Sequence, residues 1–533
     1  MATNDFQNVN LSGGSGSGGS SIPNLTTLEP LGGGADDAPQ ISSALHDAKT
    51  AGGGTVLLSN GTYSIQSDIS PTGQDYMCGV HLVGQGEDTI LSVDSGITVA
   101  AIKLAGNSIA ATKVVNNVTA GDATITMTTH SDAGLFVPGD IIAIKGTDSE
   151  SVVDIETRHE ITAANATSGV VTLREPIFKT LTTVTIADFW GSDDNTYSAM
   201  NNSIENMQIK LNYSPGAAID GILAVDQKDF VVKDVMFRGW TSNFATNGNA
   251  PLVIQQSLNA KVSNVQIEGS KNQGILLQQS YLSSIKDCVV DNCMTSTSSA
   301  MPIDLNSSFE CLVENNLINR GLGTGGGIGI SGSNIARRNK IINNRIIKTV
   351  SYGVKLTNAK NTLVKDNHFE ATADAAVYID GPRNIVEGNS MHKCQLAGQF
   401  VAANGSYSSF NGNVISQSVS YGVFGSANTV GAIISNNIFN TGGGNDPCIS
   451  PTTMSSACIS GNVISSWTGK GIYLQGSCVD NLVNGNMIFS TSSDGIKLDD
   501  GCTNNMISMN HMRGLTLTQG AGAGNDFISN KVA

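Results

Sequence analysis

The chain has few charged residues and no long apolar run. Asp, Glu, Lys and Arg make up 14% of its 533 residues, well below the ~25% usual in globular proteins. Together with a high glycine content, this excludes a coiled coil and an ordinary helical enzyme. No run approaches the ~18 apolar residues of a membrane-spanning helix. The opening residues, MATNDFQNVN, lack the basic and apolar regions of a secretory signal. We therefore expect neither membrane insertion nor export through a signal peptide.

The charge that is present is mainly negative. The 29 basic and 44 acidic residues give a formal net charge of −15, which repels phosphate backbones and argues against nucleic-acid binding. The nine cysteines show none of the paired CxxC spacings of a metal site. We expect reduced thiols, no metal and no cofactor, in a protein made in a cytoplasm.

Glycine is abundant, with 60 residues, and it marks the organisation of the N-terminal part. The tract LSGGSGSGGSSI predicts a flexible tether behind a short docking peptide, so that 1–22 form the first unit. In the next unit, 23–106, Asp36 and Asp37 are expected to cap a helix over about 39–50, which the glycines of AGGGT end before a strand, TVLL.

The segment 107–190 has a different pattern. Alternating stretches such as ATITMTT, DIIAIKG and GVVTLRE are separated by turn residues. They predict a small inserted antiparallel β domain with no chemistry of its own.

One phrase recurs in the last unit, 191–533: an apolar residue, two small or polar positions, Asn and a spaced apolar residue, as in VENNLI and ISGNVI. A second phrase, such as GVKLT or GIYLQ, follows each and keeps step with it. A fixed period of ~20–30 residues with two short β-like segments predicts a solenoid, here an all-β right-handed parallel β-helix. The recurring asparagines are Asn316, Asn344, Asn367, Asn389, Asn413, Asn437, Asn462, Asn486, Asn510 and Asn530.

Parallel stacking explains these asparagines. Equal positions lie one strand spacing apart, ~4.8 Å, so each buried amide can donate to the next carbonyl. Upstream the same position is expected to be apolar, at Cys288, Val265, Val235 and Met207. Cys478 and Cys502, one period apart, are expected to stack as inert buried thiols.

The stretch GGGADDAPQISSALHDAKTAGGGTVLLSNGTYSI resembles the N-terminal cap of the pectate-lyase-like right-handed β-helix superfamily, especially its bacteriophage tailspike members. The resemblance implies a homotrimeric virion spike that binds, and often cleaves, a bacterial surface polysaccharide. It also implies docking on a phage tail or baseplate protein through the N-terminus, and release from the host cytoplasm by lysis. Tailspikes commonly end in a separate trimerisation domain, whereas here the repeat runs almost to Ala533. Either the β-helix itself makes the trimer or another protein does.

Because inward residues fill a β-helix, a site must lie in the outward columns. In the second phrase the outward position holds aromatic residues, on which the C–H faces of sugar rings stack. We predict a glycan track of Tyr378, Phe400 and Phe424 with Lys355; alternatively, these aromatics pack between subunits or under loops. The full outward column is Leu276, Asp304, Gly329, Lys355, Tyr378, Phe400, Phe424, Tyr473 and Lys497.

A second outward column follows the Asn phrase and carries acids. Glycoside hydrolysis needs two carboxyl groups ~5–9.5 Å apart. We predict Asp304 and Glu268 as the catalytic pair with Asp291 as a third carboxylate, and Arg238 or Arg320 holding substrate. The column is Lys210, Arg238, Glu268, Asp291, Asn319, Ile347, Glu370, His392, Ser416 and Asn440.

Several alternatives stay open. The acids can be solvated surface charges, and the rival cluster Glu370, Asp374 and Asp380 near Arg383 offers the same chemistry. A polysaccharide lyase would instead use a base such as Lys271, Lys355 or His392. The polar loops TSTSSAM and RGLGTGGG can build groove walls. The competing functions are a hydrolytic tailspike, a non-enzymatic glycan-binding or structural spike, and a monomeric lyase or epimerase.

Overall fold

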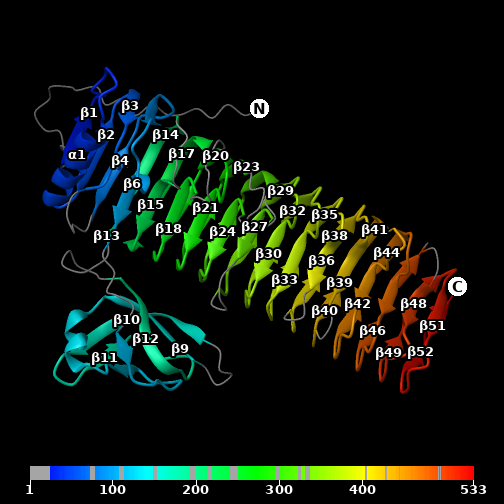
Figure 1. Ribbon diagram of the computed structural model, residues 1–533. Helices are drawn as coiled ribbons and strands as arrows, with labels where there is room; N and C mark the ends of the chain where they lie inside the picture. The colour runs from blue at the N-terminus through cyan, green and yellow to red at the C-terminus, as the bar shows by residue number, and fades with distance from the viewer. Residues whose placement is uncertain are drawn as a thin grey trace, which may run out of the picture.

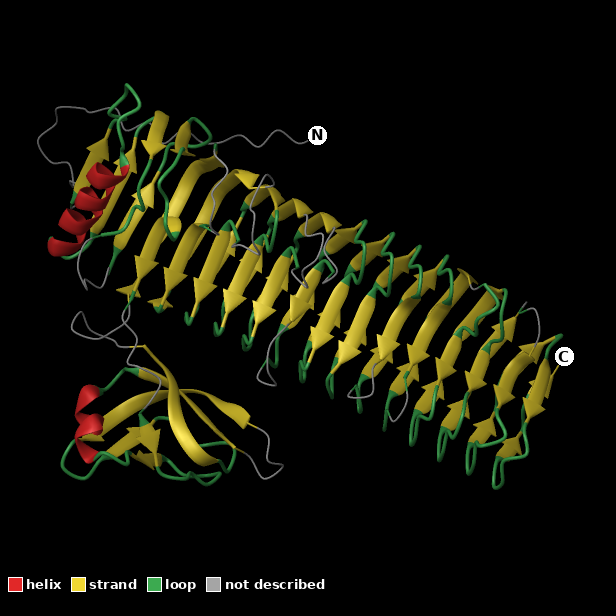
Figure 2. Ribbon diagram, in the orientation of Figure 1, coloured by secondary structure: helices red, strands yellow, loops and turns green. Residues whose placement is uncertain are grey.

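The computed structural model of the chain is a long rod of short parallel strands with a smaller β unit beside its N-terminal part (Figure 1). Helix is confined to one α-helix and one short 3₁₀ turn among the described residues, as Figure 2 shows. None of the described helices has the length and apolarity to cross a membrane. The described residues are 24–71, 78–106, 113–147, 153–190, 199–212, 219–240, 250–293, 301–321, 326–330, 336–401, 405–426, 429–442, 444–489, 491 and 494–532.

The helix α1 (Ala38–Thr50) covers the N-terminal end of the rod, as the sequence predicted. Ile41 and Leu45 are buried against the first coils. The two aspartates act differently from the expected caps. Asp36 accepts the backbone N–H of Ala38 at 3.1 Å, whereas the Asp37 carboxylate accepts the N–H of Ser64 at 2.8 Å and so joins the helix start to a strand.

Two long parallel sheets form the rod. Sheet B has 14 strands, one from each turn that contributes to it, so that at the ~4.8 Å strand spacing it is roughly 60 Å long. The strands of sheet B are β6 (Ala100–Ala105), β15 (Asp220–Val225), β18 (Leu252–Gln255), β21 (Ile275–Gln278), β24 (Ile303–Asn306), β27 (Ile328–Ile330), β30 (Val354–Thr357), β33 (Val377–Asp380), β36 (Ala397–Val401), β39 (Tyr421–Gly425), β42 (Ile449–Pro451), β45 (Ile472–Leu474), β48 (Asp494–Leu498) and β51 (Thr516–Gln519).

Sheet A has 31 strands, because each main turn contributes two that meet at a corner. A two-stranded sheet of β13 (Ala199–Met200) and β16 (Gln227–Lys228) lies beside it. The strands of sheet A are β1 (Leu25–Leu28), β2 (Gly54–Leu58), β3 (Gly61–Ile65), β4 (Val80–Val83), β5 (Thr89–Val93), β14 (Ser203–Leu211), β17 (Val231–Trp240), β19 (Lys261–Ser263), β20 (Gln266–Ser270), β22 (Ser284–Lys286), β23 (Val289–Cys293), β25 (Leu312–Glu314), β26 (Leu317–Gly321), β28 (Lys340–Ile342), β29 (Arg345–Ile347), β31 (Leu363–Lys365), β32 (His368–Glu370), β34 (Ile385–Glu387), β35 (Ser390–His392), β37 (Ser409–Asn411), β38 (Val414–Ser416), β40 (Ile433–Ser435), β41 (Ile438–Gly442), β43 (Cys458–Ser460), β44 (Val463–Trp467), β46 (Leu482–Asn484), β47 (Met487–Phe489), β49 (Met506–Ser508), β50 (His511–Arg513), β52 (Asp526–Ile528) and β53 (Lys531–Val532).

The core follows from the alternation of side chains along each strand. In β30, Val354 and Leu356 point inward and are fully buried, while Lys355 between them is partly exposed. Each fully buried Val, Leu or Ile contributes about 1.5–3 kcal/mol. A single turn has no second layer of its own, so it buries this face by stacking on its neighbours.

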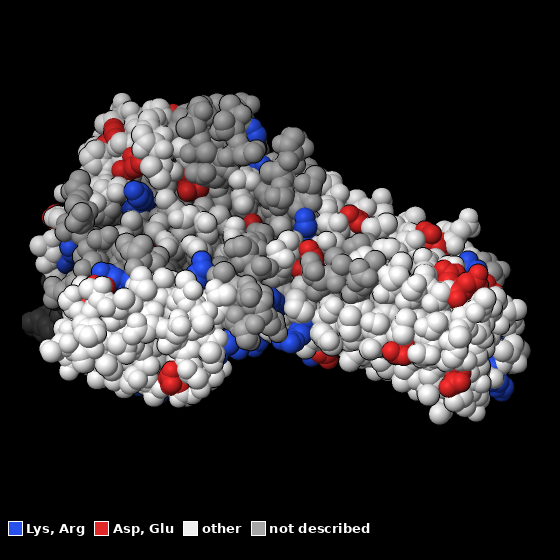
Figure 3. Space-filling view, turned by 60° about the horizontal axis from the view of Figure 1, so that its bottom comes forward, with Lys and Arg blue, Asp and Glu red and all other residues white. Residues whose placement is uncertain are grey.

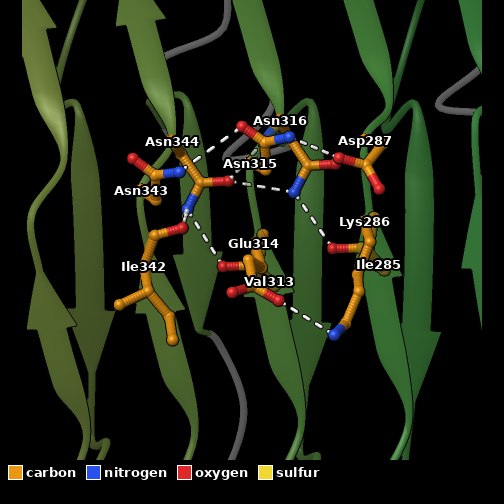
Figure 4. Close-up of polar contacts among 10 residues, drawn as sticks. All are labelled: Ile285, Lys286, Asp287, Val313, Glu314, Asn315, Asn316, Ile342, Asn343 and Asn344. Carbon is orange, nitrogen blue, oxygen red and sulfur yellow. Dashed lines mark hydrogen bonds and ion pairs between the residues drawn. The ribbon is translucent and has the colours of Figure 1, made fainter.

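The predicted asparagine column is confirmed and lies inside the rod. Asn316 donates its side-chain amide to Asn344 Oδ1 at 2.9 Å and to the backbone oxygen of Ile285 at 3.0 Å (Figure 4). Asn344 Oδ1 also accepts the backbone N–H of Asn316 at 2.9 Å. Upstream, the backbone of Cys288 donates to Asn316 Oδ1 at 2.9 Å, which places Cys288 in the same column, as expected.

The residue before each of these asparagines makes the corner between the two strands of sheet A. Its backbone is left-handed, with φ of 59° at Asn315 and 56° at Asn343. Asn, Asp and Gly tolerate this conformation better than other residues. Later turns use glycine there, as at Gly388 and Gly412 with φ of 66° and 65°. This requirement explains the repeated NN, DN and GN pairs.

The cysteines are all free, as expected. Cys478 and Cys502 are fully buried, and the bridge between Val479 and Thr503 sets them one above the other on neighbouring turns. Burial raises the pKa of Cys288 to about 12, so this thiol stays protonated and unreactive.

The inserted unit is an antiparallel β sheet with its own core, as the sequence predicted. Its strands are ordered β7-β12-β9-β10-β11-β8, and its buried side chains include Ile142, Ile161 and Leu181. The 3₁₀ turn η1 (His130–Leu135) covers one end. Its strands are β7 (Val114–Val115), β8 (Thr124–Thr126), β9 (Ile141–Thr147), β10 (Val153–Asn165), β11 (Val170–Leu173) and β12 (Thr182–Trp190).

A small aromatic cluster holds this unit against the rod. Trp190, at the end of β12, meets the ring of Tyr281 edge-on at 4.9 Å between centroids and donates its Nε1–H to the backbone oxygen of Gln256 at 3.2 Å. Tyr281 stacks in turn on Phe309 of the next turn at 5.2 Å.

Candidate functional site

The two predicted outward columns are confirmed by the strand register. In sheet B, Lys355 pairs with Tyr378, Tyr378 with Phe400, and Phe400 with Phe424. In sheet A, Glu268 pairs with Asp291 on the next strand. Phe400 therefore has the predicted backbone position, but its side chain lies outside the described residues.

The middle of sheet B presents a pair of tyrosines. The rings of Tyr352 and Tyr378 have centroids 4.7 Å apart at 41°, and Lys355 Nζ lies 5.4 Å from the centroid of Tyr352. Burial raises the pKa of Tyr378, and Asp380 and Asp374 raise it further. Burial, and then Asp374, raise the pKa of Tyr352 as well. The pKa values of both tyrosines therefore lie further above neutral pH than usual. The two phenols remain neutral hydrogen-bond donors.

Sequence reasoning missed Tyr352, together with Tyr421, which lies 4.7 Å from Phe424 between ring centroids. Both tyrosines precede a glycine at the start of a strand, in the phrase YGV. The alternation of inward and outward side chains applies only within the strands and therefore assigns these two residues to a turn. In the structure their side chains lie against the outward column of sheet B. The repeated phrase YGV, at 352–354 and 421–423, is the signal that could have found them.

A tyrosine–aspartate contact recurs along this side of the rod. Tyr421 hydrogen-bonds to Asp446 of the next turn, and Tyr473 donates to Asp499. Burial, followed by the hydrogen bond to Asp499, raises the pKa of Tyr473 to about 12. The carboxylates of Asp446 and Asp499 therefore hold the tyrosine side chains in place by hydrogen bonds.

Two of the three predicted catalytic carboxylates form ion pairs. Arg238 donates from Nε to Glu268 Oε2 at 2.9 Å, and Gln266 donates to Glu268 Oε1 at 3.1 Å. Arg320 donates from Nη2 to Asp291 Oδ2 at 2.7 Å. The structure thus brings Glu268 and Asp291 together on neighbouring strands, β20 and β23. We call these four charged residues, Arg238, Glu268, Asp291 and Arg320, the acid–arginine cluster.

Asp304 has a different environment, in sheet B on β24. Only 3% of its surface is exposed, and Gln273 donates to its Oδ2 at 3.5 Å. Gly329 on the next strand has no room for a side chain, because a Cβ there would lie 1.2 Å from Met301 Sδ. The predicted groove walls, TSTSSAM and RGLGTGGG, fall largely outside the described residues, at 294–300 and 322–325.

The rival cluster is more dispersed than the acid–arginine cluster. Glu370 lies 3.9 Å from both Arg345 and His368, whereas Asp374 contacts Tyr352, which precedes β30. His392, a predicted lyase base, shares a hydrogen bond of 2.9 Å with Ser416.

A further buried acid, Asp220 on β15, was not predicted. Its surface is 5% exposed, and its Oδ1 has no hydrogen-bond partner within the part of the chain that the structure describes. Burial raises its pKa to about 8, against the opposing effect of a hydrogen bond from the Ala250 backbone. Its strand, DGILAV, has an ordinary sequence, so nothing in the local pattern marked it.

Comparison with known proteins agrees with this architecture. The sequence profile of the "Right handed beta helix region" family matches residues 220–344 and 295–439. The chain contains a right-handed parallel β-helix. A search of curated protein sequences found no match.

Solved structures extend the likeness over nearly the whole chain. The tailspike protein of E. coli bacteriophage HK620, solved in complex with a hexasaccharide, is 13% identical, with a TM-score of 0.50 over 93% of this chain and 77% of that one. The tailspike gp49 of Pseudomonas phage LKA1 is 16% identical, with a TM-score of 0.48 over 91% and 77%. At these identities the likeness concerns the fold, and it confirms the expected resemblance to tailspike β-helices at that level.

Proposed function

We propose that the chain is a phage tailspike, a receptor-binding protein of the virion that binds a bacterial surface polysaccharide, O-antigen or capsule, and hydrolyses it. The observation that carries the proposal is the outward tyrosine pair of sheet B, Tyr352 and Tyr378, with Lys355 beside it. The HK620 tailspike was solved in complex with a hexasaccharide, which supports a glycan partner for this chain.

The tyrosine pair suits a sugar chain for two reasons. Phenol rings offer flat apolar faces to the C–H side of a sugar, and their hydroxyl oxygens can accept hydrogen bonds from sugar hydroxyls. Phe424 continues the surface along the rod axis. A polymer that lies along sheet B would therefore meet aromatic side chains on successive turns.

Hydrolysis is assigned to Asp304, Glu268 and Asp291. A glycosidase uses one carboxyl group as acid and another as base or nucleophile, in different environments. Asp304 is shielded from water, whereas Glu268 is partly exposed and held by Arg238. We assign Asp304 as the acid and Glu268 as the base, with Arg238 and Arg320 available to sugar hydroxyls at the rim.

The test is release of reducing ends from a panel of purified bacterial surface polysaccharides. Asp304→Asn should lower turnover by about 10²–10⁴-fold while binding is kept. The exposed corner residue Asp480 gives a matched control, Asp480→Asn, with unchanged turnover. Loss of turnover in Asp374→Asn but not in Asp304→Asn would move the chemistry to the rival cluster, and an unsaturated product would mean a lyase.

One observation favours a second candidate, a spike that binds glycan without cleaving it. Glu268 and Asp291 are each bonded to an arginine, as in a stable surface network. Binding that is lost in Tyr378→Ala, with no turnover of any polysaccharide by the unmodified chain, would establish this function.

Self-association is part of the proposal, as a trimer of parallel chains. Four turns of sheet A, from β37–β38 to β46–β47, carry no charged residue on their strands and expose apolar side chains, among them Val414, Ile433, Ile438 and Met487 at 42–45%. Because each chain has a net charge of −15, electrostatic repulsion between copies is weakest where they meet on such a face. We call these four turns the uncharged face.

Light scattering of the full chain tests this part. The mass should correspond to three chains and should fall to one in Ile438→Glu. The control Val350→Glu, an exposed apolar residue outside the uncharged face, should remain trimeric. Attachment to the phage tail or baseplate is assigned to 1–22, which lie outside the described residues.

A further inference from the structure

The ends of the last three strands of sheet B line a cavity, open to solvent, that lies several turns from the acid–arginine cluster. Its volume is about 590 Å³, within the ~300–1,000 Å³ typical of small-molecule sites. The cavity is bounded by residues at the ends of β45, β48 and β51. Its polar lining residues are Ser477, Lys497, Asp499, Asp500, Thr518 and Gln519.

Glycines at the corners let successive turns pack closely beside this cavity. A Cβ on Gly501 would lie 2.9 Å from the backbone oxygen of Gly476, and a Cβ on Gly520 would lie 2.2 Å from Asp500 Oδ1. Gly476 itself has a φ of 65°. All three glycines line the cavity, so its floor is backbone that a ligand can approach closely.

The charged groups of the lining are held in place before any ligand arrives. Lys497 Nζ lies 5.0 Å from the ring centroid of Tyr473, and the hydroxyl of Tyr473 donates to Asp499. Asp499 also accepts the backbone N–H of Gly476 at 3.0 Å. Asp500 accepts the N–H of Ala521 at 2.9 Å. Fixed side chains lose less conformational entropy on binding.

The chemistry of the lining selects a class of ligand. Lysine, amide and hydroxyl donors alternate with two carboxylates, and Figure 3 shows acidic side chains gathered beside a basic one near the C-terminal end of this face. Two carboxylates against one lysine disfavour an anion, and so polar a lining disfavours an apolar molecule. Sugar hydroxyls, which both donate and accept, match such a lining.

We propose that this cavity is a second carbohydrate site, which binds one neutral sugar unit of the polysaccharide independently of the tyrosine pair. The inference rests on the proposed glycan-binding function and extends it to the C-terminal end of the rod. A polymer held at both places binds more tightly than at either one alone, because the second contact is intramolecular.

The test uses the full-length chain and saturation-transfer NMR with glucose, galactose, mannose, rhamnose and N-acetylglucosamine as separate probes. At least one sugar should bind the unmodified chain and Tyr378→Ala equally. Ser477→Phe, which fills the cavity from an exposed corner, should weaken that binding by at least about tenfold, as should Asp500→Ala. Ser263→Phe, an outward residue on β19, is the matched control and should bind like the unmodified chain.

The outcomes separate this inference from the proposed function. If no probe binds, or if Ser477→Phe and Asp500→Ala bind as well as the control with unchanged melting temperatures, the second site does not exist. Polysaccharide binding that depends on Tyr378 would still stand in that case. If instead Tyr378→Ala keeps full polysaccharide binding while Ser477→Phe loses it, the cavity stands and the tyrosine pair is not the site.

Discussion

Asn389 donates its side-chain amide to Asn413 Oδ1 at 2.9 Å, one turn further along the rod. It also donates to the backbone oxygen of Val364 at 2.9 Å, and its Oδ1 accepts the backbone N–H of Asn367. Removing this side chain leaves buried partners on both sides without a hydrogen bond.

Asn389→Ala should therefore lower the free energy of unfolding by about 3 kcal/mol, since each unsatisfied buried group costs about 1–3 kcal/mol. Denaturant unfolding followed by circular dichroism measures this loss. Asn440→Ala, an exposed asparagine on β41, is the control and should change stability by less than about 0.5 kcal/mol. Equal losses of unfolding free energy at the two positions would mean that the internal column does not stabilise the fold more than an exposed asparagine does.

The sequence predicted this column because one residue type recurs at one position. A second internal ladder at another corner was missed, because its members vary in type. Cys311 donates its N–H to Asn339 Oδ1, Thr362 to Asn384 Oδ1, and Asn384 to Ser408 Oγ, at 2.9–3.2 Å. Asn and Ser side chains can each accept a hydrogen bond from the backbone N–H at this position. The ladder therefore repeats in the structure without a recurring residue type in the sequence.

Gln399 interrupts the apolar core of sheet B. It lies between Val377 and Val423 in the register, its surface is fully buried, and neither polar atom of its amide has a partner among the described residues. Gln399→Val should raise the free energy of unfolding by about 1–3 kcal/mol, because it removes an unsatisfied buried amide. The matched change on the surface, Gln395→Val, should not stabilise the chain. A lower melting temperature in Gln399→Val would show that the amide has a partner in solution.

Asp220 should make stability depend on pH. Its pKa is raised to about 8 in the folded chain from 3.8, so the folded state holds a proton that the unfolded state loses. Stability is then highest at acidic pH and falls as pH rises from about 4 to 8. In Asp220→Asn this part of the decline should disappear, so that the variant gains melting temperature at pH 8 and little at pH 4. A gain that is the same at both values would contradict the assignment.

Trp190 should control docking of the inserted unit. Trp190→Ala removes the edge contact with Tyr281 and the hydrogen bond to Gln256, while the core of the inserted unit is left intact. Loss of a large buried aromatic at an interface costs about 2–4 kcal/mol. Limited proteolysis should then release the inserted unit much faster than from the unmodified chain. Phe178→Ala, an exposed aromatic of the same unit, should not change the rate.

The candidate site was less predictable than the fold. Alternation along strands placed Lys355, Tyr378 and Glu268 in their columns, because register follows from the period alone. The ion pair of Arg238 with Glu268 was not foreseen, since it depends on the direction in which each side chain extends between neighbouring turns. Asp220 was missed for a related reason: burial of an acid is decided by what packs around it rather than by its neighbours in sequence.

The strand that resumes the rod after the inserted unit has an unusual position. Asn212 follows β14 and donates to Asp94, which follows β5, although the two residues are 118 apart in the chain. Beyond β14, pairings join residues of adjacent coils that are close in the chain, so assembly there proceeds by short steps. The entry to the rod is instead a long-range closure with a larger entropic cost. If the inserted unit folds first, it shortens the effective loop between β5 and β14. This lowers the entropic cost of joining the first coils to the rest of the rod.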